Sequence, residues 1–179
     1  MWKTINTDKL VDTIYVSVYK DLVELPDGFI FEDFYTVRLP DAAMIAAITD
    51  AGEIILKSEY RYAIGEKVIE CPTGMFENYE SIPLVVAKRE LLEETGYSSD
   101  NWLYLRSTLE STSKLTNCMH LFLATECNCI SDQHLDRNEQ IDVIRVSLKD
   151  AVQMVMDGKI NANSSAHLIL KADKILGGK

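Results

Sequence analysis

Residues that would indicate a disulfide framework, a zinc site or a membrane span are scarce in this sequence. Only four of its 179 residues are cysteine, and neither a second pair nor a spaced histidine pair accompanies Cys127 and Cys129 to complete a zinc site. A membrane-spanning helix would need about 18 consecutive apolar residues, and no such run occurs. The N-terminus also lacks a basic segment followed by an apolar one. We therefore expect reduced thiols, a chain that does not cross a membrane, and a cytoplasmic location.

Basic residues are also in the minority. Lysine and arginine number 18 against 28 acidic residues, and the formal net charge is −10. Nucleic-acid-binding proteins normally carry a basic patch, and an excess of negative charge opposes binding to DNA, RNA or an anionic membrane surface. Neither nucleic acid nor membrane is therefore expected as a partner. A small phosphorylated substrate can still bind such a protein where metal ions neutralise it locally.

Alternating apolar residues bounded by turns predict a series of strands. The first is placed within residues 1–20 by the alternation of Ile14, Val16 and Val18, and a turn leads from it to a second strand over residues 29–39. A nearly continuous apolar run over residues 42–49 predicts a strand buried on both faces. Further strands are expected over residues 54–60, 67–71, 101–110, 119–125 and 141–146.

Helical spacing predicts three helices. One runs over residues 83–95, a second begins after an N-cap at Ser147 and ends at Met156, and the last runs over residues 164–176. The order of elements is typical of an α/β (α+β) fold, an α/β/α sandwich around a mixed sheet. We expect an N-terminal antiparallel hairpin over residues 1–40, followed by the main domain over residues 41–179.

The helix that begins at Pro83 and ends before Gly96 is unusually acidic. Proline suits a first helical turn and glycine suits the position after the last turn, where φ is positive. Glu90, Glu93 and Glu94 lie at i, i+3 and i+4, so their carboxylates share one side of the helix and repel one another. A bound Mg²⁺ or Mn²⁺ would remove this repulsion. On charge spacing alone, a solvated acidic face is the commoner outcome.

The sequence around this helix resembles the Nudix box, G-x5-E-x7-R-E-U-x-E-E-x-G-U, in which U is apolar. The positions that carry the resemblance are Gly74, Glu80, Arg89, Glu90, Glu93, Glu94, Gly96 and Tyr97. The second half of the pattern fits without a mismatch. In the first half, eight residues separate Glu80 from Arg89, one more than the pattern has, which indicates an insertion in the loop before the helix. Glu80 is expected to support this loop.

Two segments before the box resemble the ADP-ribose pyrophosphatase branch of the Nudix hydrolases: Glu-Tyr-Arg-Tyr at residues 59–62 and Val-Ile-Glu-Cys-Pro-Thr-Gly at residues 68–74. The resemblance implies a Nudix-type sandwich and an enzyme that uses Mg²⁺ or Mn²⁺ and an attacking water. Such an enzyme cleaves the pyrophosphate bond of a nucleoside diphosphate linked to a sugar, here ADP-ribose or a related ADP-sugar. The products are a nucleoside monophosphate and a sugar phosphate. A homodimer built on the N-terminal hairpin is also implied.

The resemblance assigns roles to residues of the box. Glu90 and Glu94 correspond to the principal metal ligands, and Glu93 corresponds to a third carboxylate that binds a second metal ion or orients water. Arg89 corresponds to the arginine that holds the box carboxylates by salt bridges. The carbonyl of Thr73 lies where related enzymes offer a backbone oxygen to the metal.

Residues outside the box are assigned in the same way. In the ADP-ribose branch the general base comes from a loop after the box, which here spans residues 132–140. Glu139 is the first candidate for base or additional metal ligand, and Asp136 is the second; a surface charge is the alternative for either. Arg61 is the expected phosphate contact, because a guanidinium pairs bidentately with phosphate. Arg38 is a further candidate, with a solvated charge at a strand edge as its alternative.

Departures from the branch pattern leave other functions open. Ser-Lys-Leu-Thr at residues 113–116 stands where branch members often have Ser-Pro-Gly and a glutamate, so the second group of the substrate is open. One alternative is a non-catalytic Nudix domain that senses a nucleotide, although such domains usually lose box carboxylates and none is lost here. Another is a Nudix hydrolase acting on dinucleoside polyphosphates or nucleoside triphosphates. His120 lies in an apolar strand and is expected to be packed rather than catalytic.

Overall fold

The computed structural model describes residues 1–77 and 80–177. The chain divides into two compact units, each formed by two separate segments. The N-terminal unit comprises Met1–Asp41 and Leu109–Cys118, and the main unit comprises Ala42–Thr108 and Met119–Lys179. All four cysteines are free thiols. Within the described ranges, no helix is both long and apolar enough to cross a membrane.

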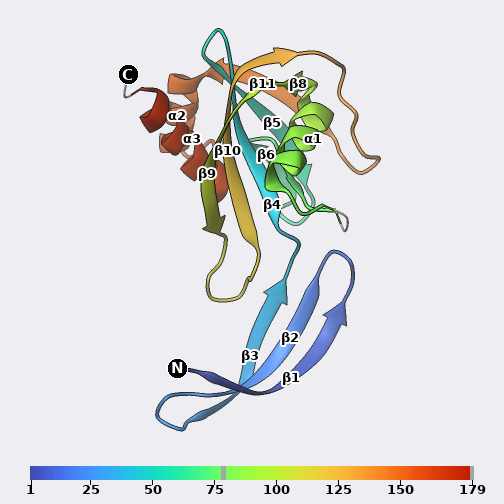
Figure 1. Ribbon diagram of the computed structural model, residues 1–179, viewed down its shortest axis with the longest axis vertical. Coiled ribbons are helices and arrows are strands. Elements are labelled where there is room, and N and C mark those ends of the chain that lie inside the picture. The colour runs from blue at the N-terminus through green and yellow to red at the C-terminus, as the bar shows by residue number, and fades with distance from the viewer. Residues whose placement is uncertain (78–79, 178–179) are drawn as a thin grey trace. The chain divides into compact units, whose positions relative to one another are not determined.

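The N-terminal unit is built on a three-stranded antiparallel sheet, drawn in blue in Figure 1. Its strands are β1 (Lys3–Asp12), β2 (Ser17–Glu24) and β3 (Ile30–Arg38), in that spatial order. Leu115, in the second segment of this unit, bridges to Val37 of β3. The expected N-terminal hairpin is therefore present as β2 and β3, and β1 extends it by one strand.

The single strand predicted through Ile14 and Val16 is wrong, because these residues lie in the turn between β1 and β2. The hydroxyl oxygen of Thr13 accepts hydrogen bonds from the backbone N–H groups of Tyr15 and Val16, at 3.2 and 3.0 Å. A threonine hydroxyl that satisfies backbone groups locally competes with strand pairing. The apolar alternation at this point therefore belongs to an exposed turn.

The main unit contains an eight-stranded mixed sheet. Its strands are β4 (Ala42–Thr49), β5 (Glu53–Arg61), β6 (Glu66–Glu70), β7 (Thr73–Met75), β8 (Tyr97–Ser98), β9 (Asn101–Leu109), β10 (Cys118–Cys129) and β11 (Ile141–Ser147). The spatial order is β11-β5-β4-β10-β8, with β6 paired to β5, β7 to β4 and β9 to β10. β4 and β10 run parallel at the centre, and β4 is antiparallel to β5. The predicted mixed sheet is confirmed.

Helices cover both faces of this sheet. α1 (Pro83–Thr95) lies on one face, and α2 (Leu148–Met156) and α3 (Asn163–Leu176) lie on the other (Figure 1). Alternate residues of β4 enter the two apolar layers. The layer under α1 includes Ala43, Ile45, Ala47, Val86, Ala87 and Leu91, and the layer under α3 includes Met44, Ala46, Ile48, Leu168, Ile169 and Ala172. The predicted α/β/α sandwich and the strand buried on both faces are confirmed.

The register of the sheet carries polar residues into the layer under α1. Ala43 of β4 pairs with Gly74 of β7 and with His120 of β10. On β5, Lys57 lies two residues after Ile55, which is buried in that layer. Successive side chains of a strand point to opposite faces, so Lys57 and Glu59 also point toward α1.

Candidate active site

The ends of α1 are fixed by the two residue types that the sequence places there. Pro83 occupies the first turn, and Gly96 adopts a left-handed conformation with φ of 75° as it donates its backbone N–H to the carbonyl of Leu92 at 2.8 Å. A Cβ atom on Gly96 would lie 2.1 Å from the carbonyl oxygen of Ser131. Glycine is therefore required both for the helix end and for the close approach of the following loop.

Glu90 lies directly against the glycine that opens the box. A Cβ atom on Gly74 would lie 1.8 Å from the carboxyl carbon of Glu90, so any larger residue would displace this carboxylate. The Glu90 side chain is 11% exposed. Burial raises its pKa to about 7, against the opposing effect of Arg89. A buried carboxylate whose ionised form is disfavoured gains from a nearby cation.

Arg89 joins three carboxylates of the box. Its Nε and Nη2 atoms donate to the two oxygens of Glu80, each at 2.9 Å. Its Nη1 atom donates to Glu90 at 2.7 Å and to Glu93 at 3.0 Å. The hydrogen bonds from Arg89 lower the pKa of Glu80. The extra residue before α1 is therefore accommodated without loss of the Glu80–Arg89 pair.

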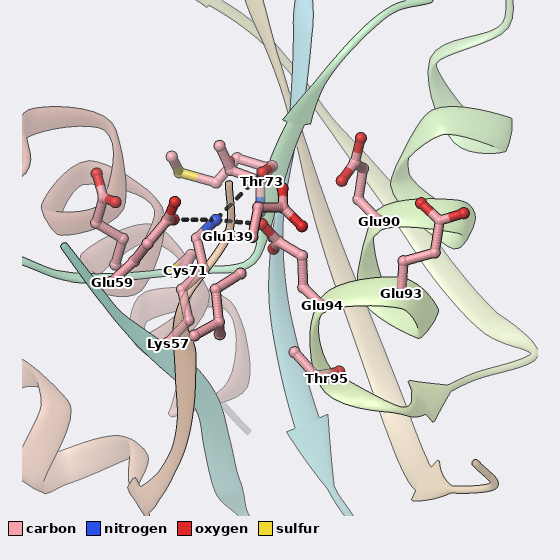
Figure 2. Close-up of polar contacts among 12 residues, drawn as sticks. Lys57, Glu59, Cys71, Thr73, Glu90, Glu93, Glu94, Thr95 and Glu139 are labelled. Carbon is pink, nitrogen blue, oxygen red and sulfur yellow. Dashed lines mark hydrogen bonds and ion pairs between the residues drawn. The ribbon is translucent and has the colours of Figure 1, made fainter. Parts of the chain in front are cut away.

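Glu94 is turned to the opposite side, toward β5 and β7 (Figure 2). Its Oε2 atom accepts a hydrogen bond from the backbone N–H of Thr73 at 2.9 Å, and its Oε1 atom pairs with the ammonium of Lys57. Burial raises the pKa of the Glu94 carboxyl, and Lys57 opposes this effect. The same burial would lower the pKa of Lys57, but the charges of Glu94 and Glu59 outweigh it and leave the pKa raised.

A row of alternating charges leads from Glu94 to the end of β5. Lys57 Nζ lies 3.1 Å from Glu59 Oε2, and Glu59 Oε2 lies 3.1 Å from Arg61 Nη1. The guanidinium of Arg61 also pairs with Glu70, at 2.7 Å from Nη2 and 2.8 Å from Nε. Arg61 is the most accessible member of this row, with 34% of its side chain exposed.

The loop after β10 is attached to the end of α1. The side-chain amide of Gln133 donates to the carbonyls of Glu94 at 2.6 Å and of Ile141 at 3.3 Å. The backbone N–H of His134 donates to the carbonyl of Glu93 at 2.8 Å. These donors satisfy carbonyls that have no partner within the helix, and they connect the loop directly to two glutamates of the box.

The predicted base candidates lie further along this loop. The carboxylate of Glu139 accepts a hydrogen bond from the backbone N–H of Asp136 at 2.9 Å. The backbone N–H of Glu139 in turn donates to the carbonyl of Asp136 at 2.9 Å. Figure 2 labels Glu139 in the same view as Lys57 and the glutamates of α1. Glu139 is half-buried and Asp136 is exposed.

Arg38 and His120 have other surroundings. Arg38, at the end of β3 in the N-terminal unit, places its guanidinium 4.3 Å from the ring centroid of Tyr19. The ring of His120 stacks on that of Tyr104 and its Nδ1 atom lies 2.9 Å from the Tyr104 hydroxyl. Phe76 packs against the same imidazole, with 5.6 Å between ring centroids. His120 is therefore packed in an aromatic cluster, as expected.

Sequence reasoning missed Lys57. Among the residues that the structure describes it is the largest fully buried side chain, and it pairs with Glu94 of α1. One signal was available in the sequence: Lys57 lies two residues after the apolar Ile55 in β5, so its side chain points to the same buried side of the sheet. Its partners Thr73 and Glu94 are 16 and 37 residues away in the sequence, so no local pattern pointed to the contact.

The residue types of this site fit a divalent cation. In the part of the chain that the structure describes, six carboxylates of this site pair with three cationic side chains. The carboxylates are those of Glu59, Glu70, Glu80, Glu90, Glu93 and Glu94, and the cations are Lys57, Arg61 and Arg89. Carboxylates and backbone carbonyls are the donors that Mg²⁺ and Mn²⁺ prefer. Over residues 1–77 and 80–177, no three His, Cys, Asp or Glu side chains are grouped to hold a metal ion. The reason is that Glu90 and Glu93 turn to Arg89 whereas Glu94 turns to Lys57.

A mixed sheet between helical layers, with a carboxylate-rich helix after a glycine-bounded loop, defines the Nudix class of fold. The family model of the NUDIX domain matches residues 38–168, and the chain belongs to this family. It is 30% identical to the ADP-ribose pyrophosphatase of Bacillus subtilis over 93% of this chain and 90% of that protein. It is 33% identical to the methanol dehydrogenase activator of Bacillus methanolicus, over 88% and 85% of the two chains.

A solved structure extends the comparison to the fold. The crystal structure of an ADP compounds hydrolase superposes with a TM-score of 0.83 at 20% identity, over 99% of this chain and 95% of that one. A more distant relative is the GDP-mannose pyrophosphatase of Pectobacterium atrosepticum, 26% identical over 68% of this chain and 66% of that protein. The fold and the family inferred from the box are therefore confirmed.

Proposed function

We propose that this protein is a metal-dependent pyrophosphohydrolase of nucleoside diphosphates linked to a sugar. ADP-ribose or a related ADP-sugar is the leading substrate, and the products are a nucleoside monophosphate and a sugar phosphate. The carrying observation is the intact box, in which Arg89 holds Glu80, Glu90 and Glu93 together and Glu94 is buried beside them. A nucleotide sensor is disfavoured because no carboxylate of the box is lost.

The relatives support this class of substrate. ADP-ribose pyrophosphatases and a GDP-mannose pyrophosphatase both match the chain, and these names share a nucleoside diphosphate joined to a sugar. The ADP-ribose pyrophosphatase of Bacillus subtilis matches over more of this chain than the GDP-mannose enzyme does. We therefore rank an ADP-sugar first and a GDP-sugar second among the candidate substrates.

The chain's own residues divide the work in this reaction. When bound, Mg²⁺ or Mn²⁺ neutralises the charge of the diphosphate and lowers the pKa of a bound water. Carboxylates of α1 would hold the metal, Arg89 keeps them in place, and the partly exposed guanidinium of Arg61 would contact a phosphate. Glu139 is proposed as the general base that takes the proton of the attacking water; its loop is attached to the end of α1 through Gln133. Asp136 is the second candidate for this step.

A turnover screen tests the proposal. The protein is incubated with ADP-ribose, ADP-glucose, GDP-mannose or UDP-glucose, with Mg²⁺ or Mn²⁺, and phosphate is measured after addition of a phosphatase. We expect one nucleotide sugar to give a signal that chelator abolishes and that Glu90→Gln removes. A signal only from dinucleoside polyphosphates or nucleoside triphosphates would contradict the substrate class, and tight nucleotide binding without product would favour the sensor.

A second copy of the chain is proposed as the partner of the N-terminal unit. The strands β1 to β3 and their turns expose an unusual number of large apolar side chains: Trp2, Ile5, Leu10, Val11, Ile14, Tyr15, Phe29, Ile30, Phe31 and Tyr35. Large exposed apolar patches commonly mark interfaces, and the resemblance stated above implies a homodimer. Light scattering at micromolar concentration is expected to give a dimer mass; a monomer would overturn this proposal.

A further inference from the structure

The ammonium of Lys57 lies within a set of oxygen atoms. Lys57 Nζ pairs with Glu94 Oε1, lies 3.1 Å from Glu59 Oε2 and lies 3.4 Å from the carbonyl oxygen of Thr73 (Figure 2). An ammonium has three N–H donors; two hydrogen bonds run to Glu94 and to the Thr73 carbonyl, and Glu59 is a third, ion-pair partner. Only 2% of the Lys57 side chain is exposed, so water does not replace these partners.

Both oxygens of Glu94 are already engaged. Oε1 faces the ammonium of Lys57, and Oε2 accepts the backbone N–H of Thr73 at 2.9 Å. The Thr73 carbonyl, the second metal ligand expected on this side, also faces Lys57. The two groups that would hold a metal ion between α1 and β7 are therefore occupied by a cation of the protein itself.

Lys57 is held in this position along its length. It pairs with Val143 of β11 and lies two residues after Ile55 of β5, and both of these residues pack in the apolar layer under α1. Moving the ammonium away from its three oxygens would place a charge among apolar groups, which is strongly unfavourable. A divalent ion that entered between Glu94 and Thr73 would instead meet the ammonium at close range.

We propose that Lys57 is a built-in cation of the active site, which takes the place of a metal ion at Glu94 and at the Thr73 carbonyl. Exchangeable divalent ions then bind through Glu90 and Glu93, on the Arg89 side of α1. Glu94 becomes a positioning residue that ties the end of α1 to β5 and β7. The inference rests on the proposed function only in that the site uses a divalent ion.

Mn²⁺ binding without substrate tests this division. Free Mn²⁺ is measured by electron paramagnetic resonance during titration of the wild-type protein, Glu90→Gln and Glu94→Gln. We expect Glu90→Gln to weaken binding by about tenfold or more, and Glu94→Gln to stay within about threefold of wild type with the same number of ions bound. Equal weakening by both substitutions would overturn the proposal.

Lys57→Met supplies the converse test. Removal of the ammonium frees Glu94, Glu59 and the Thr73 carbonyl, so this variant is expected to bind one more Mn²⁺ than wild type. The double variant Lys57→Met/Glu94→Gln should lose that additional ion. The control is Lys67→Met, which removes the exposed lysine that pairs with Asp142 at 2.6 Å and should leave Mn²⁺ binding unchanged. A folded Lys57→Met with wild-type stoichiometry would contradict the inference.

These measurements remain decisive if Lys57→Met does not fold, because the comparison of Glu90→Gln with Glu94→Gln keeps Lys57 in place. They also separate the inference from the proposed function. Failure of every nucleotide sugar in the turnover screen with the expected Mn²⁺ pattern would reject the reaction alone. Turnover of a nucleotide sugar with equal Mn²⁺ loss in the two variants would reject the role of Lys57 alone.

Discussion

The guanidinium of Arg89 binds both oxygens of Glu80 across the loop that leads into α1, with two hydrogen bonds of 2.9 Å. Only 4% of the Glu80 side chain is exposed. The two residues are nine positions apart in the sequence, which is one position more than in the Nudix pattern. The loop therefore absorbs the insertion, and the pair that fixes Arg89 is preserved.

Glu80→Gln is expected to destabilise the protein by about 1.5–3 kcal/mol, because it removes a carboxylate that accepts two hydrogen bonds from a charged group; Arg89 keeps Glu90 and Glu93 as partners. Urea unfolding at neutral pH measures the change. The matched control is Asp142→Asn, which breaks an ion pair whose two side chains are 59% and 68% exposed; its cost should stay below about 1 kcal/mol. Similar losses in the two variants would refute the structural role of Glu80.

Gly74→Ala is expected to damage the site more than the fold. The new Cβ would lie 1.8 Å from the Glu90 carboxyl carbon, so the Glu90 side chain must move away from β7. We expect Mn²⁺ affinity to fall by about tenfold or more. Glu90→Asp in the same background shortens the side chain and should recover part of the binding.

Gly52→Ala serves as the control for Gly74→Ala. It introduces strain at a φ of 75° in the turn between β4 and β5, but a Cβ there meets no atom within 4 Å. It should lower thermal stability and leave Mn²⁺ affinity unchanged. Equal Mn²⁺ affinity in Gly74→Ala and wild type would show that Glu90 does not depend on the space above Gly74.

The stability of the metal-free protein should increase as pH falls from about 7.5 to about 5. Burial raises the pKa of Glu90 from 4.5 to about 7, so the folded state binds more protons than the unfolded state between these two values. The stabilisation is present at low pH and is lost as pH rises through the folded pKa. Each pKa unit corresponds to about 1.4 kcal/mol, and we expect Tm to rise by roughly 5 °C.

Thermal unfolding in chelator at several pH values measures this effect. Glu90→Gln cannot titrate at this position and should reduce the slope of the profile; burial also raises the pKa of Glu94, which accounts for the slope that remains. Excess Mn²⁺ should flatten or reverse the profile, because a metal ion favours the ionised carboxylate. A profile of the metal-free wild type that rises with pH over the same range would contradict the assignment to Glu90.

Gln133→Leu should release the loop after β10 from the end of α1. Its amide donates to the carbonyls of Glu94 and Ile141, so the substitution leaves both carbonyls without this donor. Hydrogen exchange at the backbone N–H of His134, which bonds to Glu93, should accelerate by about tenfold, equal to about 1.4 kcal/mol of lost protection. If Glu139 is the base, kcat should fall more than KM changes.

The control for this loop is Gln153→Leu on α2. The amide of Gln153 donates to the exposed carboxylate of Asp157 at 2.8 Å. Its loss should leave exchange at His134 and turnover unchanged. Unaltered exchange at His134 in Gln133→Leu would show that the loop is held by other contacts.

Much of the fold was readable from local chemistry. α1 has the predicted bounds because Pro83 and Gly96 each suit one end of a helix, and β4 was recognised because its apolar run enters both core layers. β7 and β8 have three and two residues and show no period that a pattern can detect. The exposed turn at Ile14 was mistaken for a strand because its apolar residues alternate.

The resemblance to the Nudix box, rather than charge spacing, singled out the carboxylates of α1 and the Arg89 pairs, whereas the partner of Glu94 was missed. Glu90, Glu93 and Glu94 share a helix and were expected on one side of it, but Glu90 and Glu93 turn to Arg89 whereas Glu94 turns to Lys57. Lys57 approaches Glu94 only because β5, β7 and α1 meet in the folded main unit. The same reason hid Gln133, whose contact with the Glu94 carbonyl spans 39 residues.

The two units of the chain are interleaved in sequence, and this affects how the protein can be made. Residues 109–118 return to the N-terminal unit, where Leu115 bridges to Val37, and β10 then supplies the parallel neighbour of β4. A nascent chain that stops before residue 109 therefore lacks part of both units. Synthesis must pass residue 118 before the N-terminal unit has both of its segments, and must pass β11 before the main sheet has all its strands, so we expect the folding of both units to be completed late in translation.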